Sequence, residues 1–182
     1  MILVLLLLAA GAVTPEAVAK DFLTAYLKQS PSVENFKGAK ALAPFLSTRL
    51  NKVLADAASC QADWERQQPK GSTDKPPFVD CCLFASSPEG LPTSFALATP
   101  QVLPDGRQRI AVTFTYAEAP GTYEDPEHKL ESWNWVDSVV LASEGGRFVV
   151  DDFLYERDTP GVGQALSKSF NGCRGPKWVG ER

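Results

Sequence analysis

The stretch "WVDSVVLASEGGRFVVDDFLY", from Trp135 to Tyr155, decides the fold class of this chain. Apolar and polar residues alternate through both of its halves, and a period of two is typical of a β-strand with one covered face. Gly145 and Gly146 separate the halves at the point where a hairpin needs residues that tolerate positive φ. The stretch therefore predicts two antiparallel strands joined by a tight turn.

A second hairpin is predicted just before the first. "SFALATPQV" (94–102) and "RIAVTFTYAEA" (109–119) are strand candidates, and the "LPDGRQ" between them has the Pro-Asp-Gly chemistry of a turn. One face of the later strand carries large apolar side chains and the other carries small or hydroxyl-bearing ones, which suits a sheet covered on one side. The large side chains are those of Ile110, Val112, Phe114 and Tyr116.

Helical signals fill the N-terminal part of the chain. In "TPEAVAKDFLTAYLKQS" (14–30), Thr14 is an N-cap candidate and Pro15 occupies the first helical position. Apolar residues recur at helical spacing in this stretch, so one stripe of the helix must face a core. A second helical pattern runs from about Ala41 to Gln67, and Pro44 predicts that its regular part begins there.

Helices followed by an antiparallel meander predict an α+β fold, in which N-terminal helices pack on one face of a curved antiparallel sheet. The start "MILVLLLLAAGA" joins an apolar run to a small-x-small pattern. We therefore interpret residues 1–12 as a signal peptide and residues 13–182 as a single α+β domain. The apolar run is shorter than the roughly 20 residues of a permanent membrane span. We expect a secreted or periplasmic protein.

The two N-terminal helices, the "KPPFVDCCLF" segment (75–84), the strand "RIAVTFTYAEA" and above all the hairpin quoted first resemble the nuclear transport factor 2-like superfamily, also called cystatin-like. The chain is similar in particular to exported bacterial members grouped as a domain of unknown function. The resemblance implies a cone-shaped α+β fold with a cavity between helix and sheet. Relatives use that cavity for catalysis, ligand binding or dimerisation, so the resemblance does not choose a function.

The four cysteines are Cys60, Cys81, Cys82 and Cys173. An even count in an exported chain predicts two disulfides rather than free thiols. Neighbouring side chains on a strand point to opposite faces, so Cys81 and Cys82 are expected to reach different partners, one Cys60 and the other Cys173. Which of them takes Cys60 is open, and we assign Cys81. A direct Cys81–Cys82 bridge would need a strained peptide unit.

Composition and motifs narrow the function. The net charge of −4 disfavours nucleic acid as a partner, because nucleic-acid binders carry a basic surface. The single histidine, His128, lies in the acidic loop text "TYEDPEHKLE", where no neighbouring nucleophile would complete a catalytic triad. Phosphate loops, dinucleotide motifs, calcium loops and zinc patterns are all missing from the sequence. We therefore predict no cofactor, no metal site and no catalytic residue.

Seven residues are candidates for a ligand-binding site on the sheet. Trp133, Trp135 and Asp137 alternate in register and share one face, where an aromatic pair can floor a pocket and where a desolvated carboxyl is suited to act as a base. Asp151 and Asp152 are adjacent on the paired strand and should point to opposite faces, so one of them is expected inward. The candidates are Trp133, Trp135, Asp137, Tyr116, Asp151, Asp152 and Tyr155.

We expect an exported, disulfide-stabilised, non-enzymatic domain that binds a small ligand or a protein partner, with an immunity protein as one specific form and a homodimer left open. The alternative is a small cavity enzyme of the isomerase or dehydratase kind, because relatives in the superfamily use a cavity Asp as base. A third interpretation is a structural element of the envelope that has no cavity. Carboxylates that bond only to strand ends or to an arginine such as Arg147 would favour the non-enzymatic interpretations.

Overall fold

The computed structural model of the protein describes residues 13–29, 36–74, 83–86, 91–119, 129–156 and 163–180. Its helices are α1 (Pro15–Gln29), α2 (Phe36–Lys40) and α3 (Thr48–Gln67), with the 3-10 turns η2 (Ala43–Phe45) and η3 (Leu166–Lys168). Its strands are β1 (Ser94–Leu97), β2 (Gln101–Val102), β3 (Gln108–Ala117), β4 (Ser132–Glu144), β5 (Arg147–Tyr155), β6 (Gln164–Ala165), β7 (Cys173–Arg174) and β8 (Lys177–Trp178).

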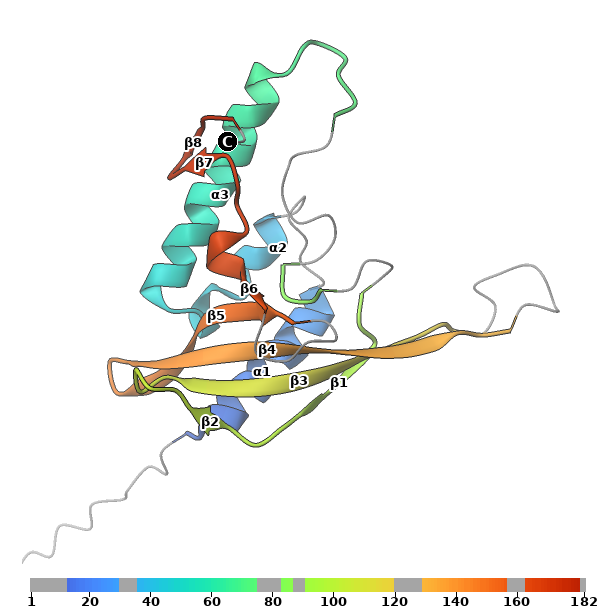
Figure 1. Ribbon diagram of the computed structural model, residues 1–182, viewed down its shortest axis with the longest axis vertical. Helices are drawn as coiled ribbons and strands as arrows, with labels where there is room; N and C mark the ends of the chain where they lie inside the picture. The colour runs from blue at the N-terminus through green and yellow to red at the C-terminus, as the bar shows by residue number, and fades with distance from the viewer. Residues whose placement is uncertain are drawn as a thin grey trace, which may run out of the picture.

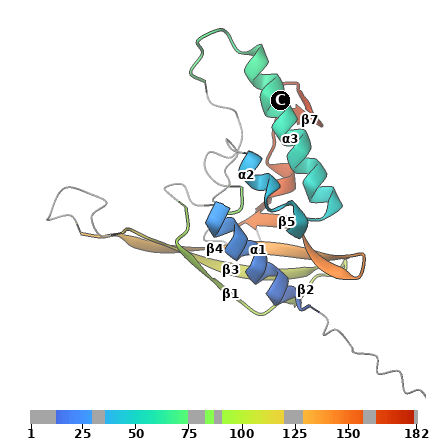
Figure 2. The same cartoon turned by 180° about the vertical axis from the view of Figure 1, so that it is seen from behind.

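The architecture is α+β, as predicted, with helices against a curved and mostly antiparallel sheet (Figure 1). The strand order is β1-β3-β4-β5-β6, and β2 also pairs with β3. α1 lies along one face of the sheet, whereas α3 rises away from it and carries the small β7–β8 hairpin (Figures 1 and 2). Within the described stretches, no helix is long and apolar enough to cross a membrane.

The three long strands form where the alternation predicted them. β3 and β4 pair along the whole length of β3, and the β4–β5 hairpin turns at Gly145 and Gly146, whose φ angles are 60° and 78°. The strand predicted at 94–102 is instead the two short strands β1 and β2, both paired with β3. Pro100 lies just before β2 and has no N–H to donate, so the sheet ladder is interrupted there.

The first helix follows its sequence signals closely. The Thr14 hydroxyl accepts a hydrogen bond from Ala17 N at 3.2 Å, which caps α1 as predicted. Phe22, Leu23 and Tyr26 are fully buried on the face toward the sheet. Burying side chains of this size contributes about 1.5–3 kcal/mol each, so packing stabilises α1 more than helix propensity does.

The region predicted as one helix from Ala41 is divided. The 3-10 turn η2 holds Pro44, and α3 begins only after Ser47, whose hydroxyl accepts from Leu50 N at 3.0 Å. Ser47 is thus the N-cap, and the helix start predicted at Pro44 was four residues early. The short helix α2 before η2 was not predicted.

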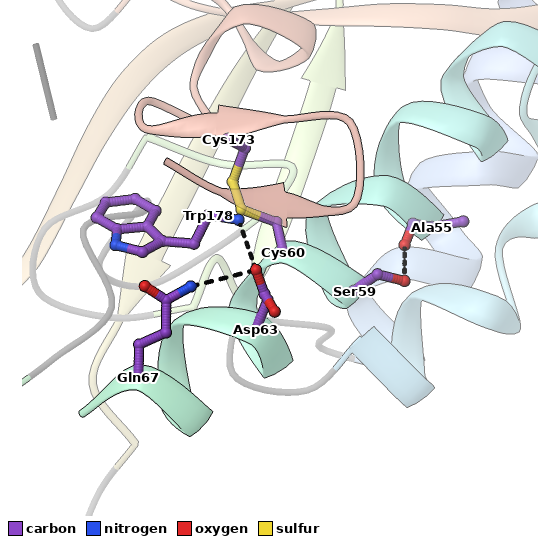
Figure 3. The surroundings of a disulfide bond; sticks show 7 residues. All are labelled: Ala55, Ser59, Cys60, Asp63, Gln67, Cys173 and Trp178. Atoms are coloured by element: carbon purple, nitrogen blue, oxygen red, sulfur yellow. Dashed lines mark hydrogen bonds between the residues drawn. A yellow bond between two sulfur atoms is a disulfide. The ribbon is translucent and has the colours of Figure 1, made fainter. Parts of the chain in front are cut away.

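One disulfide joins the far part of α3 to the C-terminal hairpin (Figure 3). It links Cys60 to Cys173 across a sequence separation of 113 residues. The predicted pairing of these two cysteines with Cys81 and Cys82 is therefore wrong, since each already has the other as its partner. The alternation argument did not consider a direct bridge between Cys60 and Cys173. Cys81 and Cys82 lie outside the described residues.

Two further contacts hold the same hairpin. Trp178 N donates to Asp63 Oδ2 at 3.0 Å, as Figure 3 shows. The Trp178 ring covers Gly172 so closely that an added Cβ there would lie 2.1 Å from it. The β7–β8 hairpin is therefore fastened to α3 by the disulfide, by the Trp178–Asp63 hydrogen bond and by an ion pair between Lys177 and Asp63 at 3.8 Å, whereas the Trp178–Gly172 contact packs the C-terminal segment on itself.

Candidate functional site

Asp137 lies fully buried in the middle of β4, opposite Val112 of β3. Its Oδ1 accepts hydrogen bonds from Ser86 Oγ (2.7 Å) and Glu156 N (2.9 Å). Its Oδ2 accepts from Ser86 N (2.8 Å) and from Trp135 Nε1 (3.0 Å). These donors favour the ionised carboxylate and occupy the lone pairs that a general base would use. Asp137 thus fastens the 83–86 segment and the end of β5 to β4.

Two tyrosines lie near Asp137. The Tyr155 hydroxyl donates to Leu83 O at 2.8 Å, which is a second tie on the 83–86 segment. Burial, followed by the nearby Tyr26 and Asp137, raises the pKa of Tyr155. Burial and the charge of Asp137 likewise raise the pKa of Tyr26, and the nearby Phe84 backbone partly opposes this rise. Among the described residues, no group forms a hydrogen bond of normal geometry with the Tyr26 hydroxyl. Both phenols are therefore interior groups that remain protonated.

Asp151 and Asp152 both bind the guanidinium of Arg49 on α3, at 3.0 and 3.1 Å, instead of facing opposite sides of the sheet as predicted. The reason is a register shift between β4 and β5, which makes Asp151 the extra residue of a β-bulge and breaks the alternation there. Asp152 also accepts from Ser167 Oγ at 2.6 Å and from Ser167 N at 3.1 Å. It therefore holds η3 against β5.

The partners of Asp151 complete an ion-pair network at this end of the sheet. Its carboxylate accepts from Ser47 Oγ at 2.8 Å and from an Arg107 nitrogen at 3.2 Å. Burial by itself raises the pKa of Asp151, but hydrogen bonds from Arg49 and Ser47 outweigh burial and hold the pKa below its usual value. Arg147, the partner named from the sequence, contributes to none of these bonds. Asp151 connects the start of α3 and the β2–β3 turn to β5.

A fourth carboxylate was missed by the sequence interpretation. Glu156 directly follows β5, and its side chain is fully buried against Arg109, with nitrogen–oxygen distances of 2.6 and 2.8 Å. Ser138 accepts from Arg109 at 3.1 Å and donates to Glu156 at 3.0 Å. No simple strand pairing signals this cluster in the sequence, because Arg109 pairs with Val140 and Ser138 pairs with Ala111 across β3 and β4. Asp137, Asp151, Asp152 and Glu156 therefore all hold parts of the fold together.

The predicted aromatic face is present. Trp133 stacks on Tyr116 with ring centroids 4.2 Å apart, and Trp135 stacks on Phe114 with centroids 5.5 Å apart. The pairs lie directly opposite each other across β3 and β4, so the shared face is confirmed. Trp135 belongs to the core, whereas Trp133 and Tyr116 are only partly buried at its margin.

A hollow lies between α2 and α3, away from every predicted site residue; we call it the α2–α3 groove. Its volume is about 220 Å³, and it is partly open to solvent. Apolar or small side chains form most of its lining, with Phe36 and Ala39 from α2 and Leu54, Ala55 and Ala58 from α3. The sequence interpretation could not place this groove, because it did not predict α2.

Neither a search for metal-ligand clusters nor comparison with known proteins assigns a function to this protein. In the parts of the chain that the structure describes, no three His, Cys, Asp or Glu side chains come together as a metal site requires. His128 lies outside those parts. Comparison of the chain with protein-family models, with curated proteins and with solved structures finds no match in any of the three. The similarity to the nuclear transport factor 2-like superfamily therefore remains an expectation from the sequence.

Proposed function

We propose that this protein is an exported, disulfide-stabilised, non-enzymatic binding domain, and that the α2–α3 groove holds a small apolar ligand. The observation that carries the proposal is the groove itself, an apolar hollow of about 220 Å³ between two helices. Small-molecule sites are typically concave and lined mostly by apolar side chains with a few polar groups, and the groove has this character.

The state of the carboxylates supports a binding role over an enzymatic one. Asp137, Asp151 and Asp152 were the three candidate bases, and each already accepts hydrogen bonds or ion pairs from the protein. A general base needs a free lone pair directed at a substrate proton. None of the three carboxylates considered as bases for the isomerase or dehydratase alternative is therefore free to act as one.

The disulfide supports export. A structural bridge such as Cys60–Cys173 forms and persists in oxidising compartments and is rare in the cytosol. The apolar N-terminal text with its small-x-small pattern agrees with a secretory route. The two observations together support a secreted or periplasmic location.

The size of the groove limits its ligand. Its 220 Å³ is below the roughly 300–1,000 Å³ of pockets for drug-sized molecules. At about 30 Å³ for each water-sized group, it holds on the order of seven such groups. A dinucleotide or a large cofactor is therefore excluded from the groove, whereas a benzene ring or a short alkyl chain fits.

Benzene titration, followed by backbone amide NMR shifts, tests the proposal. We expect saturable shifts centred on Ala39 and Leu54, and we expect Ala55→Leu to weaken them because the larger side chain fills the groove. Glu65→Leu is the matched control, since it adds the same side chain at an exposed position of α3 outside the groove. Shifts that are absent at the groove, or unaffected by Ala55→Leu, would contradict the proposal.

A further inference from the structure

The α2–α3 groove has one charged group at its rim. Lys40, the last residue of α2, contributes an exposed side chain to the lining. Its ammonium makes no ion pair or hydrogen bond with any of the described residues. Among the described residues that line the groove none is acidic, so their formal charge is positive.

The other polar residue of the lining is already engaged. Asn51 Nδ2 donates to Ala43 O at 3.0 Å and to Leu46 O at 3.2 Å, so both amide hydrogens hold η2 in place. Asn51 therefore shapes the groove wall and has no N–H left for a ligand. A polar head group in the groove would have the Lys40 ammonium as its donor.

We infer that the ligand of the α2–α3 groove is a short aliphatic carboxylate, with its alkyl chain along the apolar walls and its head group at Lys40. This inference rests on the proposed function, because it specifies the ligand of the same site. Charge complementarity selects an anion, since a cationic head would be repelled by the ammonium and a neutral head would lose the ion pair. Room for on the order of seven water-sized groups corresponds to a chain of about six to eight carbons.

The two parts of the ligand have separate signatures. Each methylene buried in the groove should strengthen binding about fourfold until the groove is full. The ion pair with Lys40 is exposed, so it should contribute no more than about fivefold and should weaken as salt is added. The alkyl chain therefore supplies most of the affinity, and Lys40 supplies the preference for an anion.

The experiment compares hexanoate with 1-hexanol, two probes of equal chain length, by amide NMR titration of the full domain. The variant is Lys40→Gln, and the matched control is Lys20→Gln, which removes an exposed lysine of α1 that is not part of the groove lining. We expect hexanoate to bind more tightly than 1-hexanol, and Lys40→Gln to weaken hexanoate two- to fivefold while leaving 1-hexanol unchanged. Butanoate and octanoate should extend the series in the fourfold steps given by each methylene.

Each outcome is decisive. Equal binding of the two probes, or equal hexanoate affinity in Lys40→Gln and Lys20→Gln, would overturn the carboxylate inference. The proposed function would survive that result if benzene still bound in the groove. If neither hexyl probe shifts the amides of Ala39 and Leu54, the inference fails, and the benzene titration then decides separately whether the groove binds apolar ligands at all.

Discussion

Replacing Asp137 by asparagine is expected to destabilise the protein by about 2–3 kcal/mol, because its buried carboxylate accepts hydrogen bonds that hold neighbouring segments together. In the variant, an amide nitrogen takes the place of one carboxylate oxygen. At the Oδ2 position it would face two fixed N–H donors, from Ser86 and Trp135. At the Oδ1 position it would face only the Glu156 N–H, because the Ser86 hydroxyl can rotate and accept.

The magnitude follows from the better of these placements. The Glu156 N–H then loses its acceptor and faces the second amide hydrogen of the new asparagine, and an unpaired buried donor costs about 1–3 kcal/mol. The remaining hydrogen bonds weaken because they no longer end on a charged oxygen, and relief of the buried charge offsets part of this loss. A net loss of about 2–3 kcal/mol is a large share of the ~5–15 kcal/mol usual for a domain. With a urea m-value of about 2 kcal/mol/M, the unfolding midpoint should fall by about 1–1.5 M.

Urea unfolding, followed by tryptophan fluorescence and far-UV circular dichroism with the disulfide intact, measures this shift. Asp21→Asn is the control, because Asp21 is an exposed carboxylate on α1 and the change in charge is the same. A midpoint for Asp137→Asn at or above that of the control would refute the reasoning. A carboxylate retained for chemistry at the expense of stability gives that result.

Two further predictions concern Asp151 and the Cys60–Cys173 disulfide. Because the folded pKa of Asp151 lies below its unfolded value of about 3.9, its contribution to stability is complete above about pH 5 and is lost as the pH falls through the folded pKa. The Asp151→Asn variant should thus lose less stability on acidification than the parent protein, as measured by thermal unfolding. An equal loss in both proteins would argue against a stabilising role of the Asp151 carboxylate. Cys173→Ser should cost about 4–5 kcal/mol on the chain-entropy model for so long a loop and should expose the β7–β8 hairpin to proteolysis. Unchanged stability and protease resistance would contradict this second prediction.

The strands and the position of Asp137 could be predicted because both depend on local alternation. Trp133, Trp135 and Asp137 share a face simply because they are two residues apart on one strand. The groups that surround Asp137 could not be predicted, because Ser86 lies 51 residues away in sequence. No local pattern carries information about contacts at such a separation, so the sequence could not show that the Asp137 carboxylate is fully hydrogen-bonded.

The other wrong predictions each have a separate physical cause. The β-bulge at Asp151 inserts one extra residue, so side chains beyond it no longer alternate with a period of two. The pattern of apolar residues in the sequence does not reveal such an insertion. α2 spans only five residues, Phe36–Lys40, which is too short to show helical periodicity. Because α2 was not predicted, the α2–α3 groove could not be predicted either. The cysteine pairing failed because sequence separation does not determine which of several connectivities forms.

The long separation between Cys60 and Cys173 has a consequence for how the protein matures. A chain is synthesised from its N-terminus, so in a chain that is exported during synthesis Cys60, Cys81 and Cys82 would all meet the oxidant before Cys173, the partner of Cys60, is made. Any early pair that includes Cys60 must be exchanged before the native bridge closes. If export is co-translational, slow oxidation or a disulfide isomerase would then raise the yield of the native bridge.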